Sequence, residues 1–126
     1  MKTIKVAEAT ERQLDWLVAY AQGRTPTLNM NSHGRVWHGW WLATGGEYER
    51  MPSYSSDWAQ GGTLIDSMVR EGLRLTGYKS LPTDPTSCQA QIGNIVTGGP
   101  TPLIAAMRCF CCSRLGPTVE VPDELF

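Results

Sequence analysis

A segment at residues 54–62 carries side chains that could bind a small polar ligand. It reads Tyr-Ser-Ser-Asp-Trp-Ala-Gln-Gly-Gly. The rings of Tyr54 and Trp58 could stack on a nucleobase, because aromatic faces bind the flat faces of bases. Ser56, Asp57 and Gln60 could form hydrogen bonds with the polar edge of that base. The same composition is also that of an ordinary capped helix start, and tryptophan is heavily buried on average.

A second segment could bind an anion. Gly98-Gly99-Pro100 leads into Thr101, which has the residue type of a helix N-cap, and proline follows at the first helical position. The start of a helix presents unpaired amides and the positive end of its dipole, so it attracts phosphate or carboxylate groups. Thr101 and Arg108 would then hold the anionic part of the ligand. An ordinary capped helix is the more common meaning of this pattern.

The chain has few residue patterns typical of catalysis. An enzyme needs an acid, a base or a nucleophile within reach of one another, but no serine lies in a Gly-x-Ser-x-Gly pattern and Asp57 and Asp66 are isolated carboxylates. We therefore expect a binding protein that does not turn its ligand over, with no catalytic residue and no cofactor.

The four cysteines are typical of free thiols and not of a metal site or a disulfide framework. Three of them crowd one short segment, and Cys109 and Cys112 fall on one face of a predicted helix without a matching pair of histidines. We expect no bound metal, and a reducing compartment.

Composition and charge exclude several classes of protein. Eleven Lys+Arg against twelve Asp+Glu give a net charge of -1, which removes the main electrostatic argument for a nucleic-acid binder. With 41% hydrophobic residues the chain can bury a core, and 126 residues suit one domain, 1–126. No apolar stretch approaches the roughly 20 residues of a membrane span, and no signal peptide follows Lys2. These features predict a cytoplasmic protein with no membrane partner.

Capping signals predict three helices that would position the two segments. Thr10 and Gln13 form a capping box, and the helix that follows would stop at Gly23. Ser56 or Asp57 would cap a helix beginning at Trp58. The pair Gly61-Gly62 disfavours a long, unbroken helix there. The last helix would run from Pro102 to the Gly116-Pro117 stop.

Alternating polar and apolar residues predict the strands. Between the first helix and the strand 36–42 we expect a polar loop, 24–35, and around Leu81–Ser87 a second loop, while 117–126 reads as a short acidic tail that is either an edge strand or a tether. The fold class is α+β, an antiparallel sheet of about four strands with helices packed on both faces. The expected strands are 2–8, 36–42, 47–51, 73–78 and 88–96.

Three segments in this order resemble one family of phage proteins. They are the Asp-Trp helix at 14–19, the Tyr-Ser-x-Asp segment at 54–62 and the Thr-Pro-opened helix at 99–109. Together they resemble the NinX-like family, found among the accessory genes of lambda-like phages, and the broader phage alpha-beta-alpha sandwich domain. The resemblance implies that fold and a phage or prophage origin. It implies no chemistry, since the family has no assigned catalytic residues.

The sequence therefore predicts a non-catalytic phage accessory protein that binds a nucleotide-like or phosphorylated molecule. In a phage, such a protein could sequester a signalling molecule of host immunity. Sites of this kind often lie between subunits, so we expect a homo-oligomer. One alternative is a protein-interaction module, suggested by the tryptophans at 37–41 and the acidic tail. A second alternative is a small enzyme that acts on a nucleotide.

Overall fold

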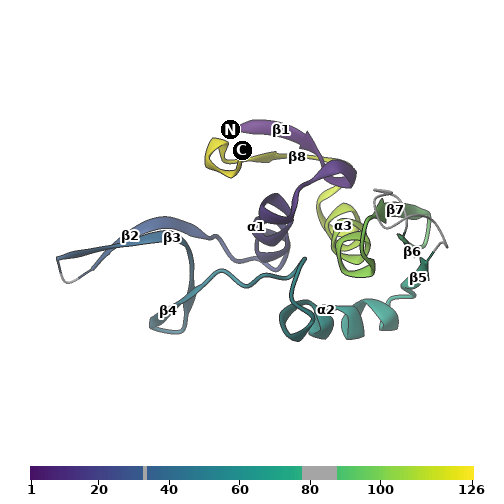
Figure 1. Ribbon diagram of the computed structural model, residues 1–126, viewed down its shortest axis with the longest axis horizontal. Coiled ribbons are helices and arrows are strands. Elements are labelled where there is room, and N and C mark those ends of the chain that lie inside the picture. The colour runs from purple at the N-terminus through teal and green to yellow at the C-terminus, as the bar shows by residue number, and fades with distance from the viewer. Residues whose placement is uncertain (33, 78–87) are drawn as a thin grey trace.

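The structure, a computed structural model, describes residues 1–32, 34–77 and 88–126. In these residues it contains three α-helices and eight strands, and every strand pair is antiparallel (Figure 1). The α+β class is confirmed. The strands are divided among three small sheets instead of forming one.

Helix α3 (Pro102–Leu115) lies at the centre of the main part of the fold, which we call the body. It packs against helix α1 (Glu11–Ala21), helix α2 (Trp58–Arg70) and a sheet of three strands. A helix enclosed on several sides needs apolar residues around most of its circumference, and α3 has them. Its buried residues are Leu103, Ile104, Ala105, Ala106, Met107, Cys109, Phe110 and Cys111.

Two sheets complete the body. Strands β5 (Arg74–Gly77), β6 (Cys88–Ile92) and β7 (Ile95–Gly99) form a meander whose last two strands contact α3. Strand β1 (Lys2–Lys5) pairs with β8 (Thr118–Val121), so the two ends of the chain lie side by side (Figure 1). The acidic tail is therefore an edge strand, and beyond it Leu125 is buried.

Strands β2 (Thr27–Ser32), β3 (Arg35–Thr44) and β4 (Glu47–Arg50) form an arm that projects away from the body, to the left in Figure 1. The predicted hairpin through Gly45-Gly46 is confirmed, but the polar loop predicted for 24–35 is wrong. Within it, Thr27–Ser32 pairs with β3 as a strand, and the polarity of these residues reflects contact with solvent and not the absence of pairing. Asn29 bulges with a φ of 52°, and its Oδ1 accepts a hydrogen bond of 2.9 Å from the Gly39 amide.

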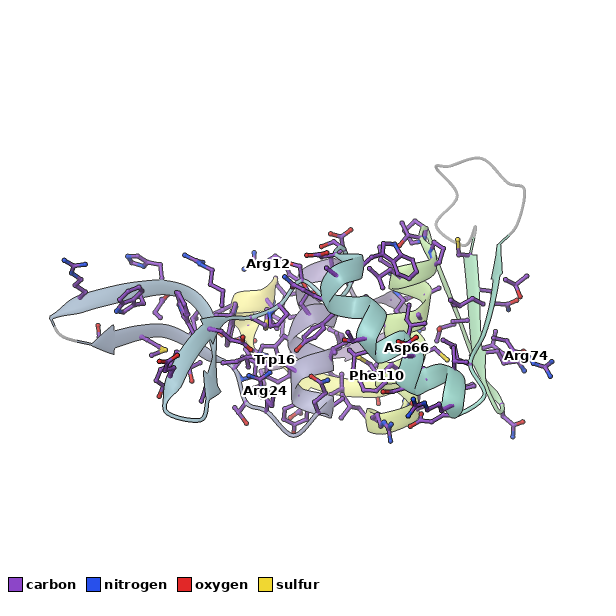
Figure 2. All side chains as sticks on the ribbon, turned by 90° about the horizontal axis from the view of Figure 1, so that it is seen from below. Arg12, Trp16, Arg24, Asp66, Arg74 and Phe110 are labelled. Atoms are coloured by element: carbon purple, nitrogen blue, oxygen red, sulfur yellow. The ribbon has the colours of Figure 1, made fainter. Side chains whose placement is uncertain are left out.

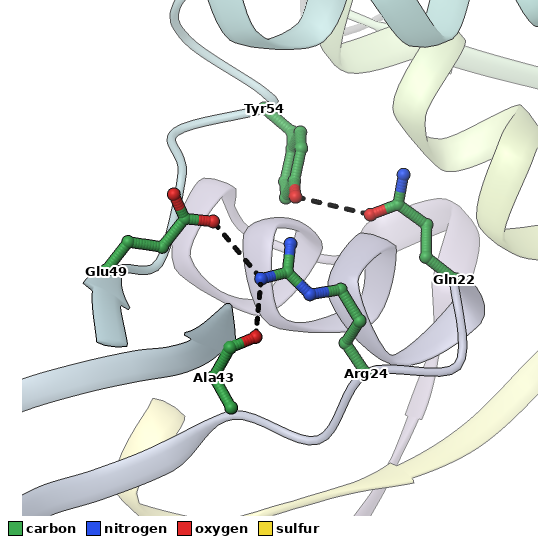
Figure 3. A network of polar contacts seen from close by, with 5 residues as sticks. All are labelled: Gln22, Arg24, Ala43, Glu49 and Tyr54. Carbon is green, nitrogen blue, oxygen red and sulfur yellow. Dashed lines mark hydrogen bonds and ion pairs between the residues drawn. The ribbon is translucent and has the colours of Figure 1, made fainter. Parts of the chain in front are cut away.

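A polar network fastens the base of the arm to the body (Figure 3). Arg24 follows α1, and its Nη2 donates to the Ala43 carbonyl at 3.2 Å and to Glu49 Oε1 at 3.1 Å. The arm strands otherwise contact chiefly one another. The arm is thus anchored at its base, where Leu42 is also buried in the core, and most of its other described residues are exposed.

Three further expectations need correction. The first strand stops at Lys5 and continues as a 3-10 turn, Val6–Glu8. The strand predicted for 88–96 is a hairpin of β6 and β7, because Gly93 turns the chain with a φ of 57°. Helix α2 runs unbroken through Gly61-Gly62. The loop predicted around Leu81–Ser87 lies outside the described residues.

Candidate functional site

The starts of all three helices converge on one pocket of about 210 Å³. We call it the helix-start pocket. Glu11 lies at the start of α1, Trp58 at the start of α2, and Thr101 caps α3. The complete lining is Glu11, Ser55, Ser56, Trp58, Thr101, Leu103 and Ile104. The segments at 54–62 and 98–101 therefore meet at this pocket, and a third helix start joins them.

Each helix start is capped by one side chain, which leaves other amides open. Thr10 accepts from the Gln13 amide at 3.4 Å, Asp57 accepts from Ala59 at 2.9 Å, and Thr101 accepts from Ile104 at 3.1 Å. The Trp58 and Leu103 amides donate to no protein group in the part of the chain that the structure describes. Open amides at helix starts are the groups that bind anions in proteins.

A half-buried carboxylate, that of Asp15, ties the pocket residue Ser55 to α1. Asp15 Oδ1 accepts hydrogen bonds from the Ser55 amide at 2.9 Å and from Ser55 Oγ at 2.8 Å. Ser55 Oγ also lies 3.2 Å from the Glu11 carbonyl, to which it can donate instead. Burial raises the pKa of Asp15 to about 6, against the lowering effect of the two bonds from Ser55. This bond joins the first two segments of the family resemblance.

The raised pKa of Asp15 predicts a dependence of stability on pH. The folded chain favours the neutral form of the Asp15 carboxyl. The stabilisation that this preference gives the folded state is complete below the pKa of the unfolded chain, near 4, and is lost as the pH rises through the folded pKa of about 6. In Asp15→Asn, Oδ1 still accepts from the Ser55 amide and Nδ2 can donate to Ser55 Oγ. As the pH rises from 4 to 7, the free energy of unfolding of Asp15→Asn, measured with urea, should increase by about 2 kcal/mol relative to that of the wild type.

The control for this experiment is Asp66→Asn, which removes an exposed carboxylate from α2. A plot of its free energy of unfolding against pH should run parallel to that of the wild type. Parallel curves for Asp15→Asn would show that Asp15 titrates as a solvated carboxyl, contrary to the burial seen here.

Three of the seven predicted site residues line the pocket: Ser56, Trp58 and Thr101. Trp58 is 55% exposed, so it is not a core residue, and one face of its indole ring can contact a ligand. Thr101 uses its hydroxyl oxygen as an acceptor for the α3 cap, and its hydroxyl proton is left to donate. These are the predicted residues that the fold brings together.

The other predicted residues from segment 54–62 lie beside the pocket and have structural contacts. Tyr54 is buried, and its hydroxyl donates to Gln22 Oε1 at 3.2 Å (Figure 3). Asp57 caps α2. Gln60 Oε1 accepts from the Ser53 amide, which closes the turn before the helix. Their roles in this structure are to shape the segment.

Arg108 also lies outside the lining of the pocket. Its Nε and Nη2 donate to the Ala9 carbonyl at 3.2 and 2.9 Å, and its Nη1 donates to the Gly98 carbonyl at 2.9 Å. Burial lowers its pKa, and the charge of Glu8 opposes that effect. The guanidinium thus joins the entry of α1 to the strand that precedes α3, and it positions two of the helix starts.

The sequence argument missed four lining residues. Glu11 and Ser55 lie beside Thr10 and Ser56, whose residue types indicate helix caps and draw attention away from their neighbours. Leu103 and Ile104 follow Pro102 and give the pocket its apolar side. A search for all helix starts, and not only those with glycine ahead, would have found Glu11.

Three of the four cysteines lie on α3, where Cys109 and Cys111 are buried and Cys112 is partly buried, and this burial suppresses the chemistry of their thiols. Burial raises the pKa values of the thiols of Cys109, Cys111 and Cys112, and a protonated thiol is a poor nucleophile and a poor metal ligand. Within residues 1–32, 34–77 and 88–126, no three His, Cys, Asp or Glu side chains form a group that could hold a metal ion.

The comparisons place the chain in a family. None of the helices in the described ranges is long and apolar enough to cross a membrane. A search of curated proteins found no match. Residues 5–114 match the sequence profile of the family described as Bacteriophage P22, NinX. That range contains α1, α2, nearly all of α3 and the whole lining of the helix-start pocket. The chain therefore belongs to the NinX family of phage proteins.

Proposed function

We propose that this protein binds a small nucleotide-like or phosphorylated molecule in the bacterial cytoplasm and holds it without chemistry. The observation that carries the proposal is the meeting of three helix starts at one pocket, with Trp58 exposed at its side. Sequestering a signalling molecule of host immunity is the biological use that fits a phage protein with such a site.

The helix starts supply the recognition of an anion. The amides of Trp58 and Leu103 and the hydroxyls of Ser56 and Thr101 come from two separate segments. Phosphate oxygens accept hydrogen bonds from such groups, and the positive ends of the helix dipoles favour their charge. The phosphate would therefore sit between α2 and α3.

The size of the pocket limits what it encloses. Its volume of about 210 Å³ is below the roughly 300–1,000 Å³ of sites that enclose a whole drug-sized ligand. The pocket would hold the phosphate end, and the base would stack on the exposed ring of Trp58.

Glu11 opposes an anionic ligand and so provides a test of its charge. Its carboxylate lies in the lining, where it repels a phosphate. Glu11→Gln should bind a phosphorylated ligand more tightly than the wild type. It should bind a neutral nucleoside with unchanged affinity.

The direct experiment is a thermal-shift screen of the purified protein against nucleoside mono-, di- and cyclic phosphates and ADP-ribose derivatives, followed by calorimetry. Binding to the native state raises its stability by about 2.7 kcal/mol at one hundred times the dissociation constant. Trp58→Ala should abolish the shift while it leaves the fold intact, because Trp58 is 55% exposed. Val96→Ala truncates another exposed apolar side chain, outside the lining of this pocket, and should bind as the wild type does.

The outcomes separate the alternatives. A ligand that is recovered unchanged after prolonged incubation supports a holding protein, and its loss with time indicates a nucleotide-acting enzyme. Equal binding by wild type and Trp58→Ala would place the site elsewhere. A flat screen with every compound class would count against ligand binding and favour a protein-interaction module.

One observation favours that second candidate. The arm exposes aromatic side chains, with Trp37 44% and Tyr48 54% exposed. Exposed aromatic residues gathered on one surface are typical of protein interfaces. A pull-down from infected cells, set beside ligand binding by the pure protein, distinguishes the two functions.

A further inference from the structure

The arm carries a hollow of about 260 Å³ that has no part in the helix-start pocket. We call it the arm hollow, and its lining is Met30, Trp37, Trp41, Glu47 and Tyr48. Trp37, Glu47 and Tyr48 are exposed, and Trp41 is half-buried. In both Figure 1 and Figure 2 the outer part of the arm stands clear of the helices. The arm hollow is therefore open to solvent.

A bulge in the arm brings the two indoles of the hollow together. Residues four apart on a regular strand are separated by about 13 Å, but the ring centroids of Trp37 and Trp41 lie 5.7 Å apart, with the rings nearly perpendicular. The register of β2 and β3 shifts at Asn29. Asn29 and Gly39 both have positive φ there, and the Asn29 side chain accepts from the Gly39 amide. Because a bulge bends a strand and re-aims its side chains, this one shapes the hollow.

The rings of the hollow attract cations. The face of an aromatic ring is partly negative, and it binds a cation that lies within about 6 Å of the ring centre. Arg50 shows this attraction inside the chain. It lies opposite Trp41 across β3 and β4, and its guanidinium carbon is 4.8 Å from the centroid of the Trp41 ring. Arg50 covers part of Trp41 in this way, while the rings of Trp37 and Tyr48 remain exposed.

Glu47 adds a negative charge to the hollow that has no counterpart in the described chain. Its carboxylate forms no ion pair with another described residue, whereas Glu49, on the same strand, pairs with Arg24 at 3.1 Å. A planar guanidinium fits a ring beside a carboxylate, because it can stack on the ring and donate two parallel hydrogen bonds to the carboxylate. A phosphate group would instead be repelled by Glu47.

We propose that the arm hollow binds an arginine side chain of a partner protein. The guanidinium would stack on the exposed ring of Trp37 and pair with Glu47. The volume of the hollow is below the roughly 300–1,000 Å³ of sites that enclose a small molecule, so it suits one side chain presented by a larger partner. Tryptophan, tyrosine and arginine are the residues that contribute most to protein interfaces. The contact rests on the second candidate function, in which the arm is a protein interface, and is independent of the helix-start pocket.

The first test compares arginine with an uncharged analogue of similar shape. NMR follows the indole N–H signals of the isotope-labelled protein during titration with acetyl-Gly-Arg-Gly-amide, and with the same peptide carrying citrulline. The arginine peptide should shift the signals of Trp37 and Trp41. It should bind about tenfold more tightly than the citrulline peptide, because only arginine gains the ring contact and the ion pair.

Three results of these titrations would overturn the proposal. Equal affinities for arginine and citrulline would show that the hollow binds by apolar contact alone. Tighter binding of a lysine peptide, or of a short oligothymidylate, would assign the hollow to a different group. The absence of any shift of the indole signals would show that arginine does not bind there.

Two substitutions separate the carboxylate from the ring. Glu47→Gln should weaken arginine binding about threefold and leave citrulline binding unchanged. Trp37→Leu keeps an apolar side chain but removes the aromatic face, so arginine should again bind about threefold more weakly, and Trp37→Phe should restore part of the loss. The control is Glu120→Gln, which removes an exposed carboxylate from β8, on the body, and should bind as the wild type does.

Arg50 provides a result with the opposite sign. Its charge repels an incoming cation, and its guanidinium already lies on Trp41. Arg50→Gln should therefore bind the arginine peptide about threefold more tightly than the wild type. Weaker binding by a variant with the circular dichroism spectrum of the wild type would show that the hollow does not select a cation, and would overturn the proposal. Wild-type affinity in both Glu47→Gln and Trp37→Leu would place the arginine site elsewhere.

These titrations use the pure protein without any nucleotide, so their failure is distinct from a failure of the ligand screen. The pull-down from infected cells separates the arginine contact from the wider protein-interaction function. A partner that is retained by wild type but not by Trp37→Leu, together with no binding of the arginine peptide, would keep that function and overturn the arginine contact alone.

Discussion

Replacing Gly61 with alanine should lower the free energy of unfolding by about 3 kcal/mol. An added Cβ would collide with the Tyr54 carbonyl oxygen and would lie 2.8 Å from Leu103 Cδ1. The Tyr54 oxygen belongs to the backbone and cannot rotate away, so α2 or segment 54–57 would have to move. Urea unfolding measures the loss, and the movement should also disturb the lining of the helix-start pocket.

The neighbouring glycine is the matched control. Gly62→Ala occupies the same helix and gains the same helical propensity, but its Cβ meets only an ordinary contact. Gly62→Ala should therefore raise the free energy of unfolding by about 0.5–1 kcal/mol. Equal losses for the two variants would show that helix α2 tolerates no alanine here for some reason other than the contact at Tyr54.

Replacing Arg108 with methionine should cost about 2–3 kcal/mol. The change removes three hydrogen bonds from a charged donor and leaves the carbonyls of Ala9 and Gly98 without their partner. The stability of Arg108→Lys should lie between those of the wild type and Arg108→Met, since one ammonium cannot reproduce the forked hydrogen bonds of a guanidinium. Thermal unfolding and urea titration both report the difference.

Arg114 offers the comparison from the same helix. Its guanidinium pairs with Glu71 and lies 5.3 Å from the ring centre of Phe110, but it is exposed. Exposed pairs contribute little, so Arg114→Met should cost less than about 1 kcal/mol. If Arg108→Met were as stable as Arg114→Met, the two carbonyls would have to be solvated in the folded protein.

The parts of the fold that depend on local chemistry were predictable. Thr10 with Gln13, Asp57 and Thr101 cap the three helices as their residue types indicate. A cap is a bond between residues two or three positions apart, so the sequence contains both partners. The glycine at the end of α3 is predictable for the same reason.

The errors arise where distant residues decide the structure. Gly61 lies within α2 without breaking it, and it leaves room for the Tyr54 carbonyl and for Leu103 of another helix, which no local pattern reports. Residues 27–32 look like a loop by polarity but pair with β3 on an exposed arm. The division of the strands into three sheets depends on which strands pair, and the pairing of β1 with β8 joins residues at opposite ends of the sequence.

The candidate site was predictable in part for the same reasons. Helix starts can be located from caps, and so Ser56, Trp58 and Thr101 were found. The direction in which a long side chain points depends on tertiary partners. Arg108 turns toward Ala9, which is distant in sequence, and Tyr54 turns toward Gln22, and no local pattern reports either bond.

The pairing of β1 with β8 has a consequence for the order of events during synthesis. Strand β1 is made before the three α-helices, but its partner at 118–121 follows all three of them. Until those residues leave the ribosome, β1 presents an open strand edge that can pair with other chains. A chain that stalls or terminates before residue 118 would keep that edge, so this topology exposes incomplete products to aggregation, and the emergence of β8 is what closes the edge.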